Sequence, residues 1–297
     1  MESSSSSSSK YMDAMELEDE QKLQHYTGLT CIGSGKFATV HRAQHTPTGQ
    51  SVALKKVQVF MDIMESSERH EVVREAKLLQ KVDHIHIIKC YDSWIEDGEF
   101  YVCLELCDKG DLSNIIKRQQ ADGTSLSLAQ VCSYSFQLSD ALMHMHERKM
   151  MHRDIKPANV FLAGENGNLK LGDLGLGRLF GSRTLETVTV VGTPYYMAPE
   201  VAQNRPYSYP ADVWSLGCVV YELCNLTSPF WEKNLNLYLL GQKIVSGRYP
   251  PVNAEYGTVM ADMIAAMITV PPDARPRMQQ IRAAYLEQEA ALEGTLS

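Results

Sequence analysis

The segment from residue 152 to residue 159 combines the side chains that phosphoryl transfer requires. It reads His-Arg-Asp-Ile-Lys-Pro-Ala-Asn, and a second carboxylate, Asp173, follows in an Asp-Leu-Gly triplet. We expect Asp154 to orient and deprotonate a substrate hydroxyl, and Lys156 to offset charge on the moving phosphoryl group. Asn159 and Asp173 offer the hard oxygen ligands that Mg²⁺ prefers. One His-Arg-Asp tripeptide could arise by chance, but its downstream partners in register favour phosphoryl transfer from ATP.

A glycine-containing loop between two strand-like segments is the candidate phosphate-binding element. Glycines let backbone amides approach phosphate groups without obstruction by a side chain. The pattern is Gly-x-Gly-x-x-Ala and it does not open a helix, which argues against a Rossmann dinucleotide site. We expect the flanking Val40 to cover the adenine. The predicted nucleotide-binding loop comprises Ile32, Gly33, Ser34, Gly35, Lys36, Phe37, Ala38, Thr39 and Val40.

A lysine and a glutamate beyond this loop form a second candidate for phosphate binding. Lys55 ends the strand-like run Val52-Ala53-Leu54-Lys55, and Glu75 falls on the same helical face as the apolar Leu79. A carboxylate on an apolar stripe is costly unless it is paired. We therefore expect Lys55 to pair with Glu75 and to position the α- and β-phosphates. The alternative is a Glu75 side chain that points into solvent.

The first part of the chain has mainly strand-like patterns. One helical pattern, over 67–82, interrupts them, and Asp97-Gly98 predicts a tight hairpin turn. The predicted strands are 29–32, 38–43, 51–57, 87–94 and 100–104.

Helical patterns dominate the chain after Asp111. Ser127 and Gln130 predict a capping box that opens a helix ending near Glu147. Asn166-Gly167 predicts a hairpin between the runs 160–162 and 169–171. Such a hairpin returns Asp173 to the neighbourhood of Asn159, so that the two residues share a metal ion.

These patterns predict an α+β fold with two lobes and a cleft between them. The lobes are a small β-rich N-terminal lobe and a larger α-helical C-terminal lobe. A serine run and an acidic stretch near the N-terminus cannot bury apolar area, and we expect them to be disordered. The predicted layout is an extension over 1–25, a catalytic domain over 26–286 (lobes 26–104 and 111–286, joined by 105–110) and a short C-terminal tail over 287–297.

Composition excludes several classes of protein. The chain has 297 residues, of which 44% are hydrophobic, as is ordinary for a soluble globular protein. There is no apolar run long enough to span a membrane and no apolar signal core. A formal charge of −8 argues against nucleic-acid binding. The seven cysteines are scattered and odd in number, which favours reduced thiols in an intracellular protein.

The segment 176–198 is the predicted activation segment, and it ends at Ala198-Pro199-Glu200. We expect a phosphate on Thr189 to pair with Arg153 and to order this segment. A cluster of hydroxyls in a loop can also be merely solvated. The hydroxyl residues of the segment are Ser182, Thr184, Thr187, Thr189 and Thr193.

Two further charged residues are predicted to have structural roles. We expect Asp212 to brace the backbone of the 152–159 loop, and Arg275 to pair with Glu200. The reason is that burying either charge without a partner would be costly.

Taken together, residues 26–286 resemble the eukaryotic protein kinases, and Lys156 stands two residues after Asp154 as in their serine/threonine branch. The segments 171–178 and 191–200 are similar to those of the NIMA-related kinases. The short members of that family are nearly all kinase domain with a small N-terminal extension, as here. Members of that family commonly have Asp-Leu-Gly in place of Asp-Phe-Gly, so Leu174 does not imply inactivity.

The resemblance implies a serine/threonine protein kinase that uses ATP and Mg²⁺, with Glu105 and Cys107 contributing to the nucleotide site. It further implies protein substrates, a preference for an apolar residue three positions before the target, and activation by a larger kinase of the same family. Roles in the cell cycle, at the spindle and centrosome and with microtubules follow from it. So does a cytoplasmic location that extends to the nucleus, centrosome or spindle. Neither the substrates nor the oligomeric state can be inferred from the sequence.

The chain departs from its relatives at two positions. Relatives often have tyrosine in place of Cys90, and that tyrosine can point into the site and inhibit, which a cysteine cannot do. Relatives commonly have serine in place of Thr189, which can still accept phosphate.

Two other functions compete with an active protein kinase. A kinase-fold scaffold would be favoured by a missing base or metal ligand, and none is missing. A small-molecule kinase with the same nucleotide site is disfavoured by the segment 192–200, which shapes the peptide groove in protein kinases.

Overall fold

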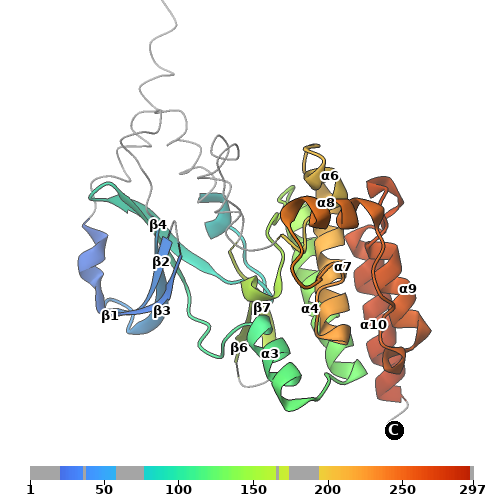
Figure 1. The fold of residues 1–297 in the computed structure, drawn as a ribbon. Helices are drawn as coiled ribbons and strands as arrows, with labels where there is room; N and C mark the ends of the chain where they lie inside the picture. The colour runs from blue at the N-terminus through green and yellow to red at the C-terminus, as the bar shows by residue number, and fades with distance from the viewer. Residues whose placement is uncertain (1–20, 36–37, 58–76, 165–166, 174–193, 295–297) are drawn as a thin grey trace, which may run out of the picture. The chain divides into compact units, whose positions relative to one another are not determined.

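The computed structural model describes residues 21–35, 38–57, 77–164, 167–173 and 194–294 (Figure 1). The chain divides into two compact units, and the division in the main chain falls between Cys107 and Asp108. Unit 1 holds the described residues before this point except His84–Ile87, which belong to unit 2. Unit 1 is rich in strands and unit 2 is rich in helices, which confirms the predicted α+β class.

Unit 1 is built on one antiparallel sheet of five strands in the order β1-β2-β3-β5-β4. Asp97 and Gly98 both have positive φ, 51° and 73°, and they form the predicted tight turn between β4 and β5. The strands are β1 (Tyr26–Ser34), β2 (Ala38–His45), β3 (Gln50–Val57), β4 (Cys90–Glu96) and β5 (Glu99–Glu105), and a 3₁₀ turn η1 (Lys22–His25) precedes them.

An aromatic stack forms the core on one face of this sheet. The ring of Trp94 lies 5.3 Å from the rings of both Tyr26 and Tyr101, nearly parallel to each. Trp94 is fully buried, and its indole N–H donates to Glu96 at 2.9 Å. Burial of three large rings supplies much of the apolar area that holds a small sheet together.

One predicted strand is shorter than expected at its start. The pattern favours a strand from residue 87, but β4 begins at Cys90. Ile87 instead forms a parallel bridge with Leu171 of unit 2. The apolar run of this segment therefore serves two different sheets, which local sequence alone does not indicate.

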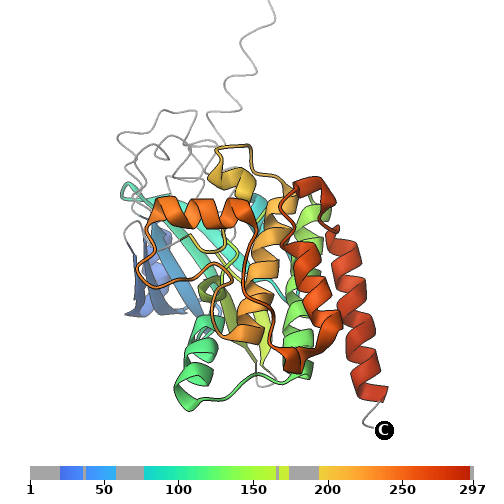
Figure 2. The same cartoon turned by 45° about the vertical axis from the view of Figure 1, so that its right-hand side comes forward.

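Unit 2 contains a layer of long helices and a small hairpin. In Figures 1 and 2, α4, α7, α9 and α10 run side by side. Its elements are α3 (Leu112–Asp122), α4 (Leu128–Glu147), η2 (Pro157–Asn159), β6 (Val160–Ala163), β7 (Asn168–Leu171), α6 (Pro199–Ala202), α7 (Tyr209–Asn225), α8 (Leu237–Ser246), η4 (Ala254–Tyr256), α9 (Gly257–Met267), η5 (Pro272–Ala274) and α10 (Met278–Gly294). No helix among the described residues has the length and apolar character needed to cross a membrane.

The central helix of unit 2 is α7, most of whose residues are buried. A Cβ added to Gly217 would lie 2.7 Å from the side chain of Met267 and 2.9 Å from that of Ile268. Glycine is therefore required there, because α7 and the end of α9 approach each other too closely for any side chain.

The capping box that opens α4 is confirmed. Ser127 accepts from the backbone N–H of Gln130, and the Gln130 side chain accepts from the backbone N–H of Ser127. A short tail is predicted over 287–297 near the C-terminus. Helix α10 continues through the first part of this segment, to Gly294.

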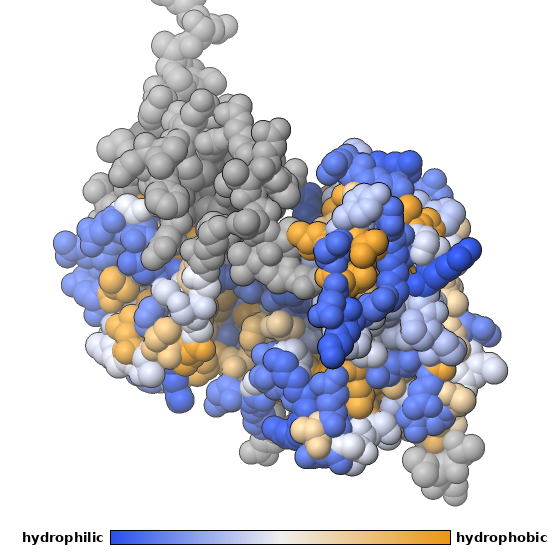
Figure 3. Space-filling view, in the orientation of Figure 1, coloured by the Kyte–Doolittle hydropathy of each residue, from blue (hydrophilic) through white to orange (hydrophobic). Residues whose placement is uncertain are grey.

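Helix α8 shows two kinds of apolar side chain. Leu240 and Ile244 are buried, whereas Leu237 and Tyr238 are exposed by 55% and 72%. The apolar side chains seen at the surface in this part of unit 2 lie among hydrophilic ones (Figure 3). A single buried stripe thus anchors α8 to its unit.

Candidate functional site

The loop of unit 2 that carries Asp154 holds this carboxylate between two other predicted site residues. Lys156 Nζ lies 3.0 Å and 2.7 Å from the two carboxylate oxygens. The amide nitrogen of Asn159 donates to Asp154 Oδ2 at 2.8 Å and to the Asp154 carbonyl at 2.7 Å. The Asp154 side chain is 56% exposed. It is therefore positioned by its neighbours and still open to a substrate hydroxyl.

These contacts decide which atom Asn159 can offer to a cation. Its amide nitrogen is committed to Asp154. The amide oxygen remains as a hard ligand of the kind that Mg²⁺ prefers.

The hairpin that precedes Asp173 forms as predicted. β6 pairs with β7 in antiparallel register, with Val160 opposite Leu171. At the end of β7 the backbone N–H of Gly172 donates to the Asn159 carbonyl at 2.8 Å. The residue before Asp173 is therefore hydrogen-bonded to Asn159. This agrees with the prediction that the two residues share a metal ion.

The side chain of His152 links the loop at Asp154 to the segment that precedes Asp173. Its Nε2 lies 2.8 Å from the Gly172 carbonyl, and its Nδ1 lies 3.3 Å from the backbone N–H of Asp154. The ring therefore carries its proton on Nε2 and accepts through Nδ1. It is fully buried. One imidazole thus fixes the spacing between the chain at Asp154 and the chain at Asp173.

Two residues of the loop region have left-handed backbones. Arg153 has φ of 71° and Asp173 has φ of 55°. Such conformations are uncommon for residues other than glycine and cost free energy, so the surrounding bonds must impose them.

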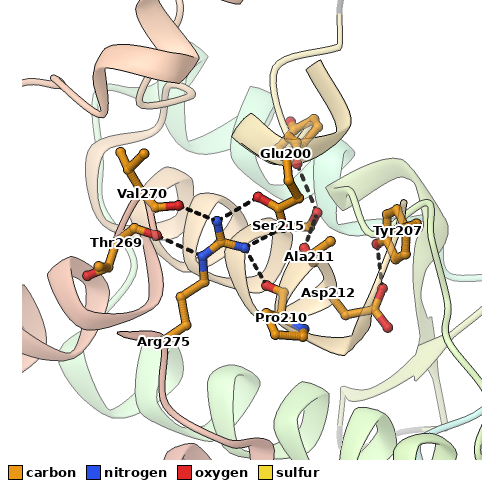
Figure 4. Close-up of polar contacts among 10 residues, drawn as sticks. Glu200, Tyr207, Pro210, Ala211, Asp212, Ser215, Thr269, Val270 and Arg275 are labelled. Carbon is orange, nitrogen blue, oxygen red and sulfur yellow. Dashed lines mark hydrogen bonds and ion pairs between the residues drawn. The ribbon is translucent and has the colours of Figure 1, made fainter. Parts of the chain in front are cut away.

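Asp212 is the main support of this loop, and Figure 4 shows its contact with Tyr207. The fully buried carboxylate accepts from the backbone N–H groups of His152 and Arg153, each at 3.0 Å, which confirms the predicted brace. It also accepts from His146 Nε2 at 2.8 Å and from the hydroxyl of Tyr207 at 2.7 Å. Burial alone would raise the pKa of Asp212, but the His146 hydrogen bond, nearby positive charge and the backbone N–H groups outweigh it and lower this pKa.

Arg275 and Glu200 form the predicted buried ion pair (Figure 4). Two guanidinium nitrogens of Arg275 lie 2.7 Å and 2.8 Å from the two oxygens of Glu200. The other N–H groups of Arg275 donate to the carbonyls of Thr269, Pro210 and Val270. All five donors are therefore satisfied, which is the condition under which a charge pair tolerates burial.

Two of the predicted nucleotide-binding residues of unit 1, Val40 and Lys55, lie on the face of the sheet opposite the aromatic stack. Val40, Lys55 and Val102 are register partners across β2, β3 and β5. Leu54, the neighbour of Lys55, packs in the aromatic core. Because side chains alternate along a strand, Lys55 and its two partners share the other face. The sheet thus places the lysine beside the valine predicted to cover adenine.

Packing against the described residues does not require the two glycines of the loop. A Cβ on Gly33 would have its nearest neighbour, Val40, at 3.8 Å, and one on Gly35 would have the Ala38 carbonyl at 3.7 Å. Neither residue has a positive φ. Glycine at these positions therefore fits a bound phosphate, whose approach to the backbone a side chain would obstruct. Of the other predicted loop residues, Ile32 and Ser34 lie at the end of β1, and Ala38 and Thr39 open β2.

The segment that joins the units carries two further predicted residues. Glu105 ends β5, and its backbone N–H donates to the Lys89 carbonyl at 2.9 Å. The side chain of Cys107 is half-buried. Cys90 is buried, which raises the pKa of its thiol to about 12, and it acts as a small core residue.

Several predicted residues lie outside the described part of the chain. Glu75 is one, so its pairing with Lys55 stays a prediction. Lys36 and Phe37 are others, and so are Thr189 and the further serine and threonine residues named in the predicted activation segment.

The sequence patterns did not indicate two residues that matter at the site, His146 and Tyr207. Both complete the hydrogen bonding of Asp212. The available signal was the expectation of a buried Asp212, because such a carboxylate needs more donors than two backbone N–H groups.

Comparison with known proteins identifies the family. The protein kinase domain family matches residues 26–286. The probable serine/threonine-protein kinase nek3 of Dictyostelium discoideum is 35% identical over 262 residues, which cover 87% of this chain and 23% of that protein. Nek1 of Mus musculus is 34% identical over 259 residues (87% of this chain, 21% of the relative), and Nek5 of Homo sapiens is 34% identical over 259 residues (87% and 36%).

The chain thus spans 21% to 36% of the length of these curated relatives. The match covers both units and all the motifs described above. The chain therefore belongs to the protein kinase domain family, within its NIMA-related (Nek) group.

Proposed function

We propose that this chain transfers the γ-phosphoryl group of ATP to serine and threonine hydroxyls of proteins. The observation that carries the proposal is the carboxylate of Asp154, which Lys156 and Asn159 hold in place while Asn159 is bonded to the residue before Asp173. One network of side-chain and backbone hydrogen bonds therefore links the proposed base to the two residues proposed to bind Mg²⁺.

Asp154 acts on the acceptor. Its exposed carboxylate orients the substrate hydroxyl and takes its proton as the oxygen bonds to the γ-phosphorus. The bond between the γ-phosphorus and the bridging oxygen breaks, and its electrons leave with ADP. Lys156, now paired with Asp154, is placed to offset the negative charge on the transferred group.

Asn159 and Asp173 would hold Mg²⁺ through an amide oxygen and a carboxylate. When bound, Mg²⁺ neutralises charge on the phosphate oxygens. Lys55 and the backbone of Gly33 and Gly35 bind phosphates from unit 1. These roles rest on donor chemistry and on the space left by the glycines.

The proposal is tested by phosphate transfer from ATP with Mg²⁺ to a serine- and threonine-containing peptide library. Replacing Asp154 by alanine is expected to lower kcat by about 10²- to 10⁴-fold, the usual contribution of a positioned base. The control is Asp262→Asn, an exposed carboxylate on α9. Transfer that survives Asp154→Ala would contradict the assignment, and ATP binding without any transfer by the wild type would favour a kinase-fold scaffold.

Activation by phosphorylation of Thr189 is the regulatory part of the proposal. The guanidinium of Arg153, 5.9 Å from the ring of Tyr207, lies next to the catalytic base and is the proposed phosphate partner. A larger kinase of the same family would add this phosphate. If kcat of the unphosphorylated chain equals that of the chain phosphorylated at Thr189, this regulation is excluded.

The cellular part of the proposal rests on the family resemblance. We propose work in the cell cycle on spindle, centrosome and microtubule proteins, from the cytoplasm and with access to the nucleus. Imaging of the tagged chain through mitosis tests it, and uniform distribution at every stage would contradict it.

A further inference from the structure

Three histidines from two separate segments lie together in unit 2. The ring of His84 is 4.6 Å from that of His144 on α4 and 5.7 Å from that of His86. His84 and His86 belong to the segment 84–87, which packs with unit 2 although the chain on both sides belongs to unit 1. We call these residues the three-histidine cluster. It lies where this short segment is attached to unit 2.

The hydrogen bonds of His84 are complete when its ring is neutral. Nδ1 accepts from the backbone N–H of His86 at 3.2 Å. Nε2 lies 3.1 Å from Asp140 Oδ2 and therefore carries the proton. A second proton would have to go on Nδ1, where it would face the His86 N–H and remove the acceptor. Protonation of His84 is thus incompatible with the turn that it closes.

His86 attaches the segment to β7. Its Nδ1 lies 3.1 Å from the Leu169 carbonyl, and its own carbonyl accepts from the backbone N–H of Leu171 at 2.9 Å. Ile87 adds the parallel bridge to Leu171. β7 continues directly into Gly172 and Asp173. One isolated bridge and the bonds of His86 therefore attach the segment to β7, the strand that leads to a proposed Mg²⁺ ligand.

The charged groups around the cluster give little support to added protons. Asp140 of α4 faces His84, but its other oxygen is already bonded to Arg282 of α10. Lys170 of β7 adds positive charge near His86. The carboxylate of Asp140 is therefore already paired with a guanidinium, and a lysine already acts on His86, before any histidine is charged.

Burial is the largest influence on the two rings of the segment. Burial lowers the pKa of His84, and charge on His144 and His86 would lower it further. Together these influences outweigh Asp140, which raises this pKa. Burial lowers the pKa of His86, helped by Lys170, and outweighs the Leu169 carbonyl and Asp140. The attached segment therefore binds protons less readily than the same residues in water. Linkage then requires that acid favours the detached state.

We propose that the three-histidine cluster is a proton-sensitive latch, which holds residues 84–87 against α4 and β7 near neutral pH and releases them as the pH falls toward 6. Release removes the Leu171 bridge and the hydrogen bond to the Leu169 carbonyl, so β7 loses a neighbour on the side of Asp173. The predicted effect on phosphoryl transfer rests on the proposed function. The detachment of residues 84–87 does not depend on the proposed function.

Hydrogen–deuterium exchange of the full chain at pH 7.5 and pH 6.0 measures the detachment. The informative amides are those of His86, Ile87 and Leu171, which the attached segment protects. A histidine that is neutral when attached and has an ordinary pKa of about 6.5 when detached raises the opening equilibrium by about fourfold over this range. We expect an increase after correction for the intrinsic pH dependence of exchange, and about fourfold is the most that a single histidine contributes.

The variant His84→Asn with His86→Asn keeps an acceptor near the Nδ1 position of His84 and a donor near that of His86, but cannot titrate. Its exchange at the same amides is expected to be nearly independent of pH. His144→Gln, which leaves the segment intact, is the second variant and is expected to reduce the increase. The control is His25→Asn, an exposed histidine of η1, which should behave as wild type. No increase in the wild type, or an undiminished increase in both cluster variants, would overturn the latch.

Phosphoryl transfer over the same pH range separates the latch from the proposed function. An active wild type is expected to lose activity toward pH 6 more steeply than the double variant. A chain without transfer at any pH would contradict the proposed function and leave the exchange result as the test of the latch.

Discussion

Two buried carboxylates, Glu200 on α6 and Asp212 in the first turn of α7, are stabilised in different ways. Glu200 faces a guanidinium whose five N–H groups all have acceptors. Asp212 faces two backbone N–H groups, a histidine and a tyrosine, and its donors belong to three separate stretches of chain. Glu200 is thus neutralised by one partner, whereas Asp212 uses its charge to order a loop.

Because their partners differ, Glu200 and Asp212 are expected to affect different properties, stability in the first case and activity in the second. The Arg275–Glu200 pair joins structural segments, and its hydrogen bonds within the described part of the chain involve no proposed site residue. Asp212 binds the backbone of the two residues that precede Asp154. We therefore expect damage to the pair to appear mainly as lost stability, and damage at Asp212 to appear also as a lower rate.

The largest expected effect on stability comes from breaking the ion pair with Arg275→Met. Glu200 would stay buried without its partner, which typically costs about 3–5 kcal/mol of the free energy of unfolding. Denaturant unfolding measures it, with Arg277→Met, an exposed arginine two residues along, as the control. A loss no greater than that of the control would show that the pair is not buried in solution as described.

Asp212→Asn comes next and tests the brace. Asparagine offers one oxygen, and its amide group would face the N–H of His152 or Arg153, so we expect a cost of about 1–3 kcal/mol in stability. A loop displaced by about 1 Å can lower the rate by about 10²-fold, so kcat should fall by this order in the folded variant. An unchanged kcat with reduced stability would contradict the expectation that Asp212 supports the rate as well as the fold.

Tyr207→Phe removes one of the four donors to Asp212. Its hydroxyl accounts for a single charge-assisted hydrogen bond, so about 1.5 kcal/mol of stability should be lost. Tyr209→Phe is the matched control, because the ring of Tyr209 packs against His146 and is partly exposed. Equal effects of the two substitutions would mean that the hydroxyl of Tyr207 does not support Asp212.

The smallest expected effect is a pH dependence. Because the folded pKa of Asp212 is lowered, its charged form stabilises the fold above the ordinary carboxyl pKa of about 3.9, and this contribution is lost as the pH falls through the lower folded value. The gap in unfolding free energy between wild type and Asp212→Asn should therefore narrow below about pH 4. Denaturant titrations from pH 7 to pH 3 measure this gap, and a constant gap would argue against a charged Asp212.

Much of the local structure could be predicted from the sequence. The turn at Asp97-Gly98 and the capping box at Ser127 depend on residues within a few positions of one another, and both form as expected. The hairpin before Asp173 forms for the same reason. The strand predicted from residue 87 starts later, because Ile87 pairs with a strand far along the chain.

The sequence by itself determined the family, the likeness of the 152–159 loop to a phosphoryl-transfer site and the need for a partner at Asp212 and Arg275. These follow from residue types at short spacing and from the cost of burying a charge. Only the tertiary structure decided which donors surround Asp212, that Arg275 uses all five of its N–H groups, and that three histidines meet beside β7. Those arrangements join residues far apart in the chain, and packing rather than local pattern brings them within hydrogen-bonding distance.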